Sequence, residues 1–182
     1  MIILASQSPR RKELLSKLIN EYKIIPSDID ESLYPINELS LRKAMDIAKK
    51  YPNDIIIAAD TLVYLDNEIL GKPHNENEAI KMLKKLSNRK HEVKTLYTIY
   101  CLNKRIEITK EVVSEVYFND LSDELISSYV KSKSPLDKAG AYGVQDNERF
   151  PIINKTVGSF SNIVGLPIEE LEKDLRKINI IA

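Results

Sequence analysis

The sequence predicts an α/β protein with a mixed β-sheet. Apolar runs with the length of strands alternate with segments that carry apolar residues at helical spacing. Two long strand-like segments follow each other in the middle of the chain, at residues 91–102 and 105–118. Long central strands beside α/β units indicate an elongated sheet, flanked by helices and divided into two lobes.

The first half of the chain begins with a strand, a helix and a short strand, which we expect at residues 1–5, 9–18 and 22–25. An amphipathic helix follows at residues 37–50. A strand is predicted at residues 54–59, where the five residues after Asp54 form a continuous apolar run, as expected for a strand buried on both faces. Asp66 and Asn67 then lie between two short strand-like segments, 62–65 and 68–70, which predicts a hairpin.

The second half continues the alternation. Asn75 precedes a helical pattern, and Glu78 stands three residues later, which is the spacing of a capping box. After the two long strands, we expect a helix over 122–131 that is capped by Ser122. A loop-rich stretch occupies 132–147, and a last helix is predicted at 166–177.

Composition narrows the class of protein. The chain has 182 residues, which suits a single domain over residues 1–182, or one domain with two lobes. Its 27 basic and 27 acidic residues cancel, which argues against nucleic acid as the main partner. No apolar run approaches the roughly 20 residues needed to cross a bilayer, and the N-terminus lacks a signal-peptide pattern. The single cysteine, Cys101, predicts no disulfide framework, so we expect a cytoplasmic protein.

The most informative segment lies between the first strand and the first helix. Ser8 is a natural N-cap, and Pro9 suits the first helical position, where its missing N–H costs nothing. Free backbone N–H groups at such a helix start attract anions. Arg10, Arg11 and Lys12 add positive charge in the same turn, so the segment predicts a phosphate-binding corner. The alternative is a solvated basic patch with an ordinary cap.

Carboxylates form a second group of candidates. Asp60, followed by Thr61, ends the apolar strand predicted at 54–59, and ligands of open α/β sheets gather at the carboxyl ends of strands. Asp60 could therefore hold a metal or position a water, or else simply cap a turn. Glu31 ends an oxygen-rich loop that could supply magnesium ligands, although acidic surface loops are common. Lys43, taken alone, resembles a solvated helical lysine.

Two loop segments carry further candidates. Lys72 lies between Gly71 and Pro73, and the proline favours an extended backbone that could aim the ammonium group at a phosphate. A plain surface lysine is the competing interpretation. In residues 137–145, two glycines, a charge pair and Gln145 stand in a segment without helical period. The Gln145 amide offers a donor and an acceptor to a base edge, whereas the alternative is a glycine-rich connection.

Taken together, these segments resemble the Maf family of nucleotide pyrophosphatases, and the resemblance covers nearly the whole chain. The motifs that carry it are residues 4–15 (LASQSPRRKELL), 59–61 (ADT), 71–73 (GKP), 137–145 (DKAGAYGVQ) and 162–167 (NIVGLP). Gln145 makes the loop similar to that of the subfamily that acts on dTTP and UTP. The sister subfamily, which acts on 7-methyl-GTP, carries a different loop there.

The resemblance implies a fold related to the inosine triphosphate pyrophosphatases, with a central cleft between two lobes. It implies hydrolysis of a nucleoside triphosphate to the monophosphate and pyrophosphate with a divalent cation, Mg²⁺ or Mn²⁺. By the matching positions, Asp60 would be the general base, and Glu31 would share the positioning of metal or water. The phosphates would be held by Ser8, by Arg10 or Arg11, and by Lys43 and Lys72.

Base selection would fall to Arg11, Thr61 and Gln145. The chain departs from the family pattern at two positions: Ser134 replaces the usual glutamate before Pro135, and Asp146 replaces the glycine that usually follows Gln145. The second departure puts a carboxylate next to Gln145, and it bears on the base preference more than on the reaction. A pyrophosphatase for another or modified base, such as 7-methyl-GTP, is therefore the alternative enzyme.

The family has been linked to arrest of cell division, so a nucleotide-binding regulator is the alternative from another class. The resemblance also suggests a homodimer. Only an enzyme should lose its effect when Asp60 is replaced by asparagine, which separates it from a regulator that merely binds nucleotide.

Overall fold

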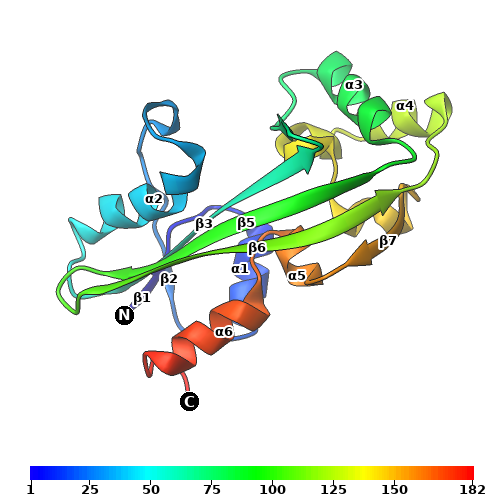
Figure 1. The fold of residues 1–182 in the computed structure, drawn as a ribbon. Helices are drawn as coiled ribbons and strands as arrows, with labels where there is room; N and C mark the ends of the chain where they lie inside the picture. Colours follow the sequence, from blue (N-terminus) through cyan, green and yellow to red (C-terminus); the bar gives the residue numbers. More distant parts are fainter. The chain divides into compact units, whose positions relative to one another are not determined.

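The computed structural model describes residues 1–182 and is built around a seven-stranded mixed sheet (Figure 1). The strands are β1 (Ile2–Leu4), β2 (Lys23–Ile24), β3 (Ile55–Leu65), β4 (Glu68–Leu70), β5 (Lys90–Cys101), β6 (Ile106–Phe118) and β7 (Ile153–Val157). The helices are α1 (Pro9–Ser16), α2 (Leu39–Ala48), α3 (Glu76–Leu86), α4 (Asp123–Lys131), α5 (Phe160–Val164) and α6 (Ile168–Lys177). None of these helices is long and apolar enough to cross a membrane.

The strand order is β2-β1-β3-β5-β6-β7, and β4 pairs with β3. β1 pairs in parallel with both β2 and β3, whereas the β3–β4 and β6–β7 pairs are antiparallel. The predicted α/β class with a mixed sheet is therefore confirmed. The sequence did not predict β7 or α5, and the stretch at 132–147 consists of short 3₁₀ turns.

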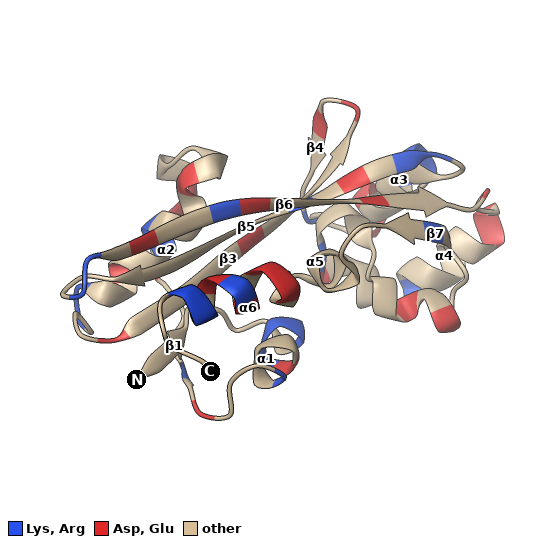
Figure 2. Ribbon diagram, turned by 60° about the horizontal axis from the view of Figure 1, so that its bottom comes forward, with Lys and Arg blue, Asp and Glu red and all other residues tan.

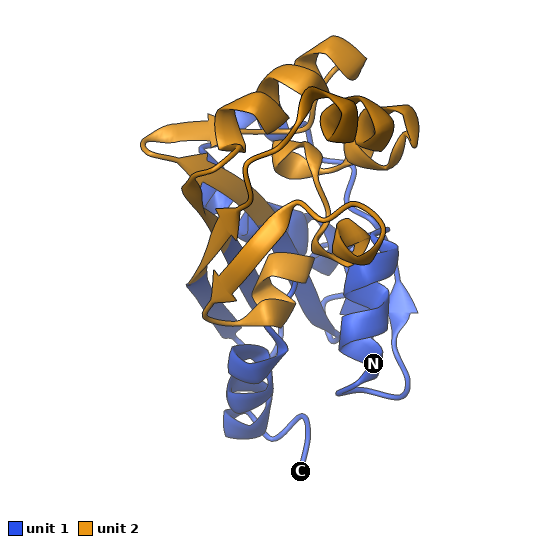
Figure 3. Cartoon of the chain, turned by 90° about the vertical axis from the view of Figure 1, so that its right-hand side faces the viewer, with its two compact units in different colours: residues 1–60, 95–112, 165–182 blue, residues 61–94, 113–164 orange.

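The chain forms two compact units (Figure 3). The first unit comprises residues 1–60, 95–112 and 165–182, and the second comprises 61–94 and 113–164. β3, β5 and β6 each contribute residues to both units.

In the first unit, the parallel pair of β1 and β3 forms the centre, with the range Ile2–Leu4 opposite Ile55–Ile57. The side chains of residues 55–59 are all buried, as their unbroken apolar run predicts. α2 packs on this pair through Ala44, Ile47 and Ala48. Residues four positions apart lie on one face of a helix, so this spacing brings a single apolar stripe to the sheet.

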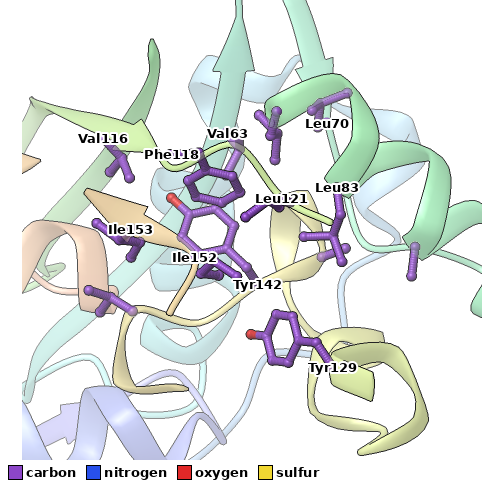
Figure 4. Close-up of a cluster of buried hydrophobic side chains, with 14 of the residues drawn as sticks. Val63, Leu70, Leu83, Val116, Phe118, Leu121, Tyr129, Tyr142, Ile152 and Ile153 are labelled. Carbon is purple, nitrogen blue, oxygen red and sulfur yellow. The ribbon is translucent and has the colours of Figure 1, made fainter. Parts of the chain in front are cut away.

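In the second unit, α3 and α4 pack over the strands around a larger apolar cluster (Figure 4). The rings of Phe118 and Tyr142 meet edge to face with their centroids 4.8 Å apart. Gly140 lies against Val63 with a φ of +70°, and an added Cβ would lie 3.0 Å from a Val63 methyl group. A larger residue at position 140 would therefore be strained in conformation and crowded by its neighbour.

Candidate active site

The start of α1 has the capped geometry that the sequence predicts. The backbone N–H of Arg11 donates to Ser8 Oγ at 3.3 Å, and Pro9 occupies the first turn. The backbone N–H of Ser8 donates in turn to Ser6 Oγ at 3.2 Å, which fixes the turn between β1 and the helix. No acidic residue stands in the first turn, where Arg10, Arg11 and Lys12 follow Pro9, and the ribbon of α1 carries the blue of basic residues (Figure 2). This helix start therefore favours an anion.

Arg11 is the arginine of this turn that the fold holds in place. Its Nε donates to the Gly165 carbonyl at 2.7 Å, and its Nη1 lies 3.5 Å from Ser6 Oγ. Burial lowers the pKa of Arg11 to about 10, against the opposing effect of Asp60, so the guanidinium stays charged at neutral pH. Arg10 lies close enough to contribute to the same lowering. The two guanidinium groups thus concentrate positive charge at the helix start.

Asp60 lies inside β3, so the prediction that it ends a strand is wrong. β3 continues to Leu65 because β4 pairs with its second half. Only residues 55–57 pair with β1, so Asp60 still lies beyond the carboxyl end of the neighbouring parallel strand. Ligands of open α/β sheets gather at the carboxyl ends of strands, and Asp60 fulfils this condition through the end of β1 rather than the end of β3.

The Asp60 carboxyl is largely buried, with 15% of its side chain exposed. Its Oδ1 lies 3.6 Å from Lys43 Nζ, whereas its Oδ2 is buried without a hydrogen-bond partner. Burial raises the pKa of Asp60, while Lys43 and Arg11 act in the opposite direction. Asp60 is thus a carboxylate with more affinity for a proton than an exposed one, and one of its oxygens is buried without a hydrogen-bond partner.

Lys43 connects Asp60 to Glu31. Its Nζ lies 3.1 Å from Glu31 Oε1, and only 16% of its side chain is exposed. Glu31 begins a short 3₁₀ turn over Glu31–Leu33, and 54% of its side chain is exposed. The interpretation of Lys43 as a solvated helical lysine is therefore wrong, because the fold places its ammonium between two carboxylates.

The remaining predicted residues belong to the second unit. Thr61 follows Asp60 in β3 and is partly buried. Lys72 is exposed and lines an open pocket of about 370 Å³, whose wall also contains His74 and Lys81. Gln145 is the exposed side chain of a turn whose neighbour Val144 is buried.

Sequence reasoning assigned no contacts to Gly165, His91 or Tyr129. The Gly165 carbonyl holds Arg11, which explains part of the glycine-containing motif at 162–167. In the second unit, His91 Nε2 lies 2.6 Å from the hydroxyl of Tyr142, and burial lowers the pKa of His91 to about 4. Tyr129 hydrogen-bonds to the turn that carries Gln145. His91 and Tyr129 stand outside the motifs, so their positions in the sequence carry no signal of such contacts, whereas Gly165 belongs to the motif at 162–167.

The carboxylates beside Lys43 fit a cation that takes most of its ligands from substrate phosphates and water. No group of three or more His, Cys, Asp or Glu side chains converges in the described chain. Asp60, with its unpartnered buried oxygen, and Glu31 offer two carboxylates on either side of Lys43. Magnesium is commonly bound by one or two carboxylates together with substrate phosphates and water, and such an arrangement fits this pair.

Comparisons with known proteins identify relatives of the chain. The family model described as "Maf-like protein" matches residues 1–178. A dTTP/UTP pyrophosphatase of Carboxydothermus hydrogenoformans is 43% identical, with 97% of each chain covered. A dTTP/UTP pyrophosphatase of Aquifex aeolicus is 42% identical, with 100% of this chain and 97% of the other covered.

A solved structure shares the fold at much lower identity. The Ham1 protein of Staphylococcus aureus aligns with a TM-score of 0.60 at 13% identity, covering 97% of this chain and 98% of that one. The match over residues 1–178 and the relatives above 40% identity lead to one conclusion: the chain belongs to the Maf family.

Proposed function

We propose that this chain hydrolyses nucleoside triphosphates, above all dTTP and UTP, to the monophosphate and pyrophosphate. The names of the relatives support the reaction and the bases. The observation that carries the proposal is the cluster of Asp60, Lys43 and Arg11, which combines a proton acceptor with two cations. A carboxylate beside phosphate-binding cations is the arrangement that water attack on a phosphoanhydride requires.

In the proposed reaction, a water molecule attacks the α-phosphorus. The bond between that phosphorus and the oxygen that bridges to the β-phosphorus breaks, and pyrophosphate leaves. Asp60 orients the water and accepts its proton, and its raised pKa favours this role. Lys43 and Arg11 offset the negative charge that develops on the leaving group.

A divalent cation, Mg²⁺ or Mn²⁺, is part of the proposal, held by Asp60 and Glu31. Such an ion supplies charge neutralisation at the phosphates when it is bound. Ser8, Arg10 and Lys72 are each proposed to contact phosphate. Thr61, Gln145 and Arg11 are proposed to select the base. A cytoplasmic location, a single functional domain and a homodimer are further predictions from the sequence.

A nucleotide panel tests the proposal. Wild type, Asp60→Asn and Asp54→Asn would be incubated with each triphosphate and Mg²⁺ or Mn²⁺, and the products separated by chromatography. Asp54 is the matched control, because its carboxylate pairs with the N-terminal amine at 3.4 Å and lies outside the cluster. Monophosphate and pyrophosphate from dTTP and UTP, lost only in Asp60→Asn, are expected. Preferred turnover of 7-methyl-GTP or another base would contradict the base assignment, and binding without turnover would favour the regulator.

A further inference from the structure

The turn that carries Gln145 is closed at both ends by one buried hydroxyl group. The backbone N–H of Gly143 donates to the Tyr129 hydroxyl oxygen at 2.9 Å. That hydroxyl donates to Asp146 Oδ2 at 2.7 Å, and the Tyr129 side chain is fully buried. The backbone N–H of Asp146 also donates to the Gly143 carbonyl at 3.0 Å. Tyr129 therefore holds Gly143, two residues before Gln145, and Asp146, directly after it. The contact with Asp146 depends on the carboxylate of that residue.

Gln145 itself lies against the bare backbone of this turn. A Cβ added at Gly143 would lie 2.9 Å from Gln145 Oε1 and 2.7 Å from Lys138 Cε. The Gln145 amide is thus folded over Gly143, next to the aliphatic stem of Lys138. The Gln145 amide oxygen and the Lys138 stem therefore occupy the space that a side chain at position 143 would need.

The Asp146 carboxylate connects the turn to Lys138. Its Oδ2 accepts a second hydrogen bond from Ser134 Oγ at 2.7 Å. Lys138 Nζ donates to the same Ser134 Oγ at 3.0 Å and to the Ser134 carbonyl at 2.7 Å. Only 13% of the Lys138 side chain is exposed, and its Nζ also donates to Asp137 Oδ1 at 3.0 Å. Ser134 and Asp146 are therefore in direct contact, and Ser134 Oγ lies between the Asp146 carboxylate and the Lys138 ammonium.

We propose that Asp146 is a positioning residue that sets the Gln145 amide through Tyr129, and that it takes the place of a carboxylate at position 134. The inference rests on the proposed function, in which Gln145 selects the base. A side chain at position 134 lies within 3.0 Å of Lys138 Nζ, so a glutamate there would pair with the ammonium directly. One carboxylate, at position 134 or at position 146, can accept from the donors around it. Carboxylates at both positions would repel each other, and the absence of both would leave the buried Tyr129 hydroxyl without an acceptor.

The test compares Asp146→Gly, Ser134→Glu and the double variant S134E/D146G. In Asp146→Gly we expect KM for dTTP and UTP to rise about tenfold, the effect of roughly one lost hydrogen bond, while kcat stays within about threefold. The preference for these nucleotides over the other triphosphates of the panel should fall to the same extent. In the double variant, KM and the preference should return to within about threefold of wild type. Asp146→Asn keeps an acceptor for Tyr129 and should retain most of the preference.

A control variant removes the effect of glycine on the backbone. Glu148→Gly makes the same kind of change at an exposed residue of the same 3₁₀ turn and should leave KM and the preference unchanged. A purely structural role of Asp146 would lower the active fraction for all nucleotides equally, with KM and the preference unchanged. That outcome, or a double variant no better than Asp146→Gly, would overturn the inference.

Thermal unfolding provides a second measurement that needs no turnover. Both single variants should lower Tm, and the double variant should recover most of that loss, whereas additive losses would refute the exchange of carboxylates. Failure of the proposed function looks different. If wild type hydrolyses no nucleotide, or if Gln145→Ala keeps the preference, the role of Gln145 fails while the unfolding result still decides whether the two carboxylate positions are coupled.

Discussion

Replacing Asp60 by asparagine is expected to abolish turnover and to remove a pH-dependent cost to stability. Asparagine keeps the shape of the side chain but accepts no proton, so kcat should fall by about 10²–10⁴, the usual contribution of a general base. This corresponds to about 2.7–5.5 kcal/mol of transition-state stabilisation. Lys43 and Arg11 remain in place, and Lys43 loses a carboxylate 3.6 Å away that competes with phosphate. The affinity for nucleotide measured without metal should therefore stay constant or increase.

The stability of wild type should depend on pH through the same carboxyl. Burial raises the pKa of Asp60 in the folded state above its unfolded value near 3.9. Below about pH 4, both states are protonated and the group contributes nothing. As the pH rises through the interval between the two pKa values, the free energy of unfolding falls by about 1.4 kcal/mol per pH unit. The decrease levels off above the folded pKa. The free energy of unfolding of Asp60→Asn should not show this decrease, because asparagine does not titrate.

Urea unfolding of wild type, Asp60→Asn and Asp54→Asn at pH 4 and pH 7, together with steady-state kinetics, measures both effects. The free energy of unfolding of Asp60→Asn should increase relative to wild type between the two pH values, and that of Asp54→Asn should not. A variant that keeps more than about one tenth of kcat would refute the role of Asp60 as base. A difference in stability that shrinks as the pH rises would refute the account of its burial.

Three further predictions concern other groups. Lys43→Met removes a charge that lowers the pKa of Asp60, so the acid limb of the pH profile of kcat/KM should move to higher pH. An acid limb that stays fixed or moves to lower pH would contradict the effect of Lys43 on Asp60. Lys110→Met should lower the free energy of unfolding in urea by about 2 kcal/mol, less than for a fully buried pair, because Asp174 is buried at 2.6 Å from a lysine that is 39% exposed. The exposed Lys173→Met is the control and should cost less than about 0.5 kcal/mol. Chelation with EDTA should stop turnover until Mg²⁺ or Mn²⁺ is added back, and an unchanged Tm is expected because no three potential metal ligands converge in the fold.

The sequence was most informative where the physics is local. The caps at Ser8, Asn75 and Ser122 form as predicted, with hydrogen bonds of 3.3, 2.8 and 3.1 Å from the third residue after each cap. A cap depends only on its own side chain and the next three residues, so a short motif is enough to identify it. The apolar run at 55–59 likewise indicated a strand buried on both faces.

Elements with weak local signals were harder to predict. β7 carries three consecutive polar residues, 154–156, and is held by pairing with β6, which no short segment of sequence reveals. The extent of β3 through Asp60 has the same origin, since β4 extends it. Pairing with a distant strand contributes hydrogen bonds that local propensity does not encode.

The sequence by itself determined the fold class, the capped basic turn at Ser8 and the family motifs, because each depends on residue types at fixed short spacing. Only the tertiary structure decided that Lys43 lies between Asp60 and Glu31, and that Ser134 and Asp146 form one network with Tyr129. Charge interactions and hydrogen bonds act over a few ångströms in space, whatever the separation along the chain. Groups whose properties depend on a distant neighbour, such as the pKa of Asp60, therefore acquire them only when the chain is folded.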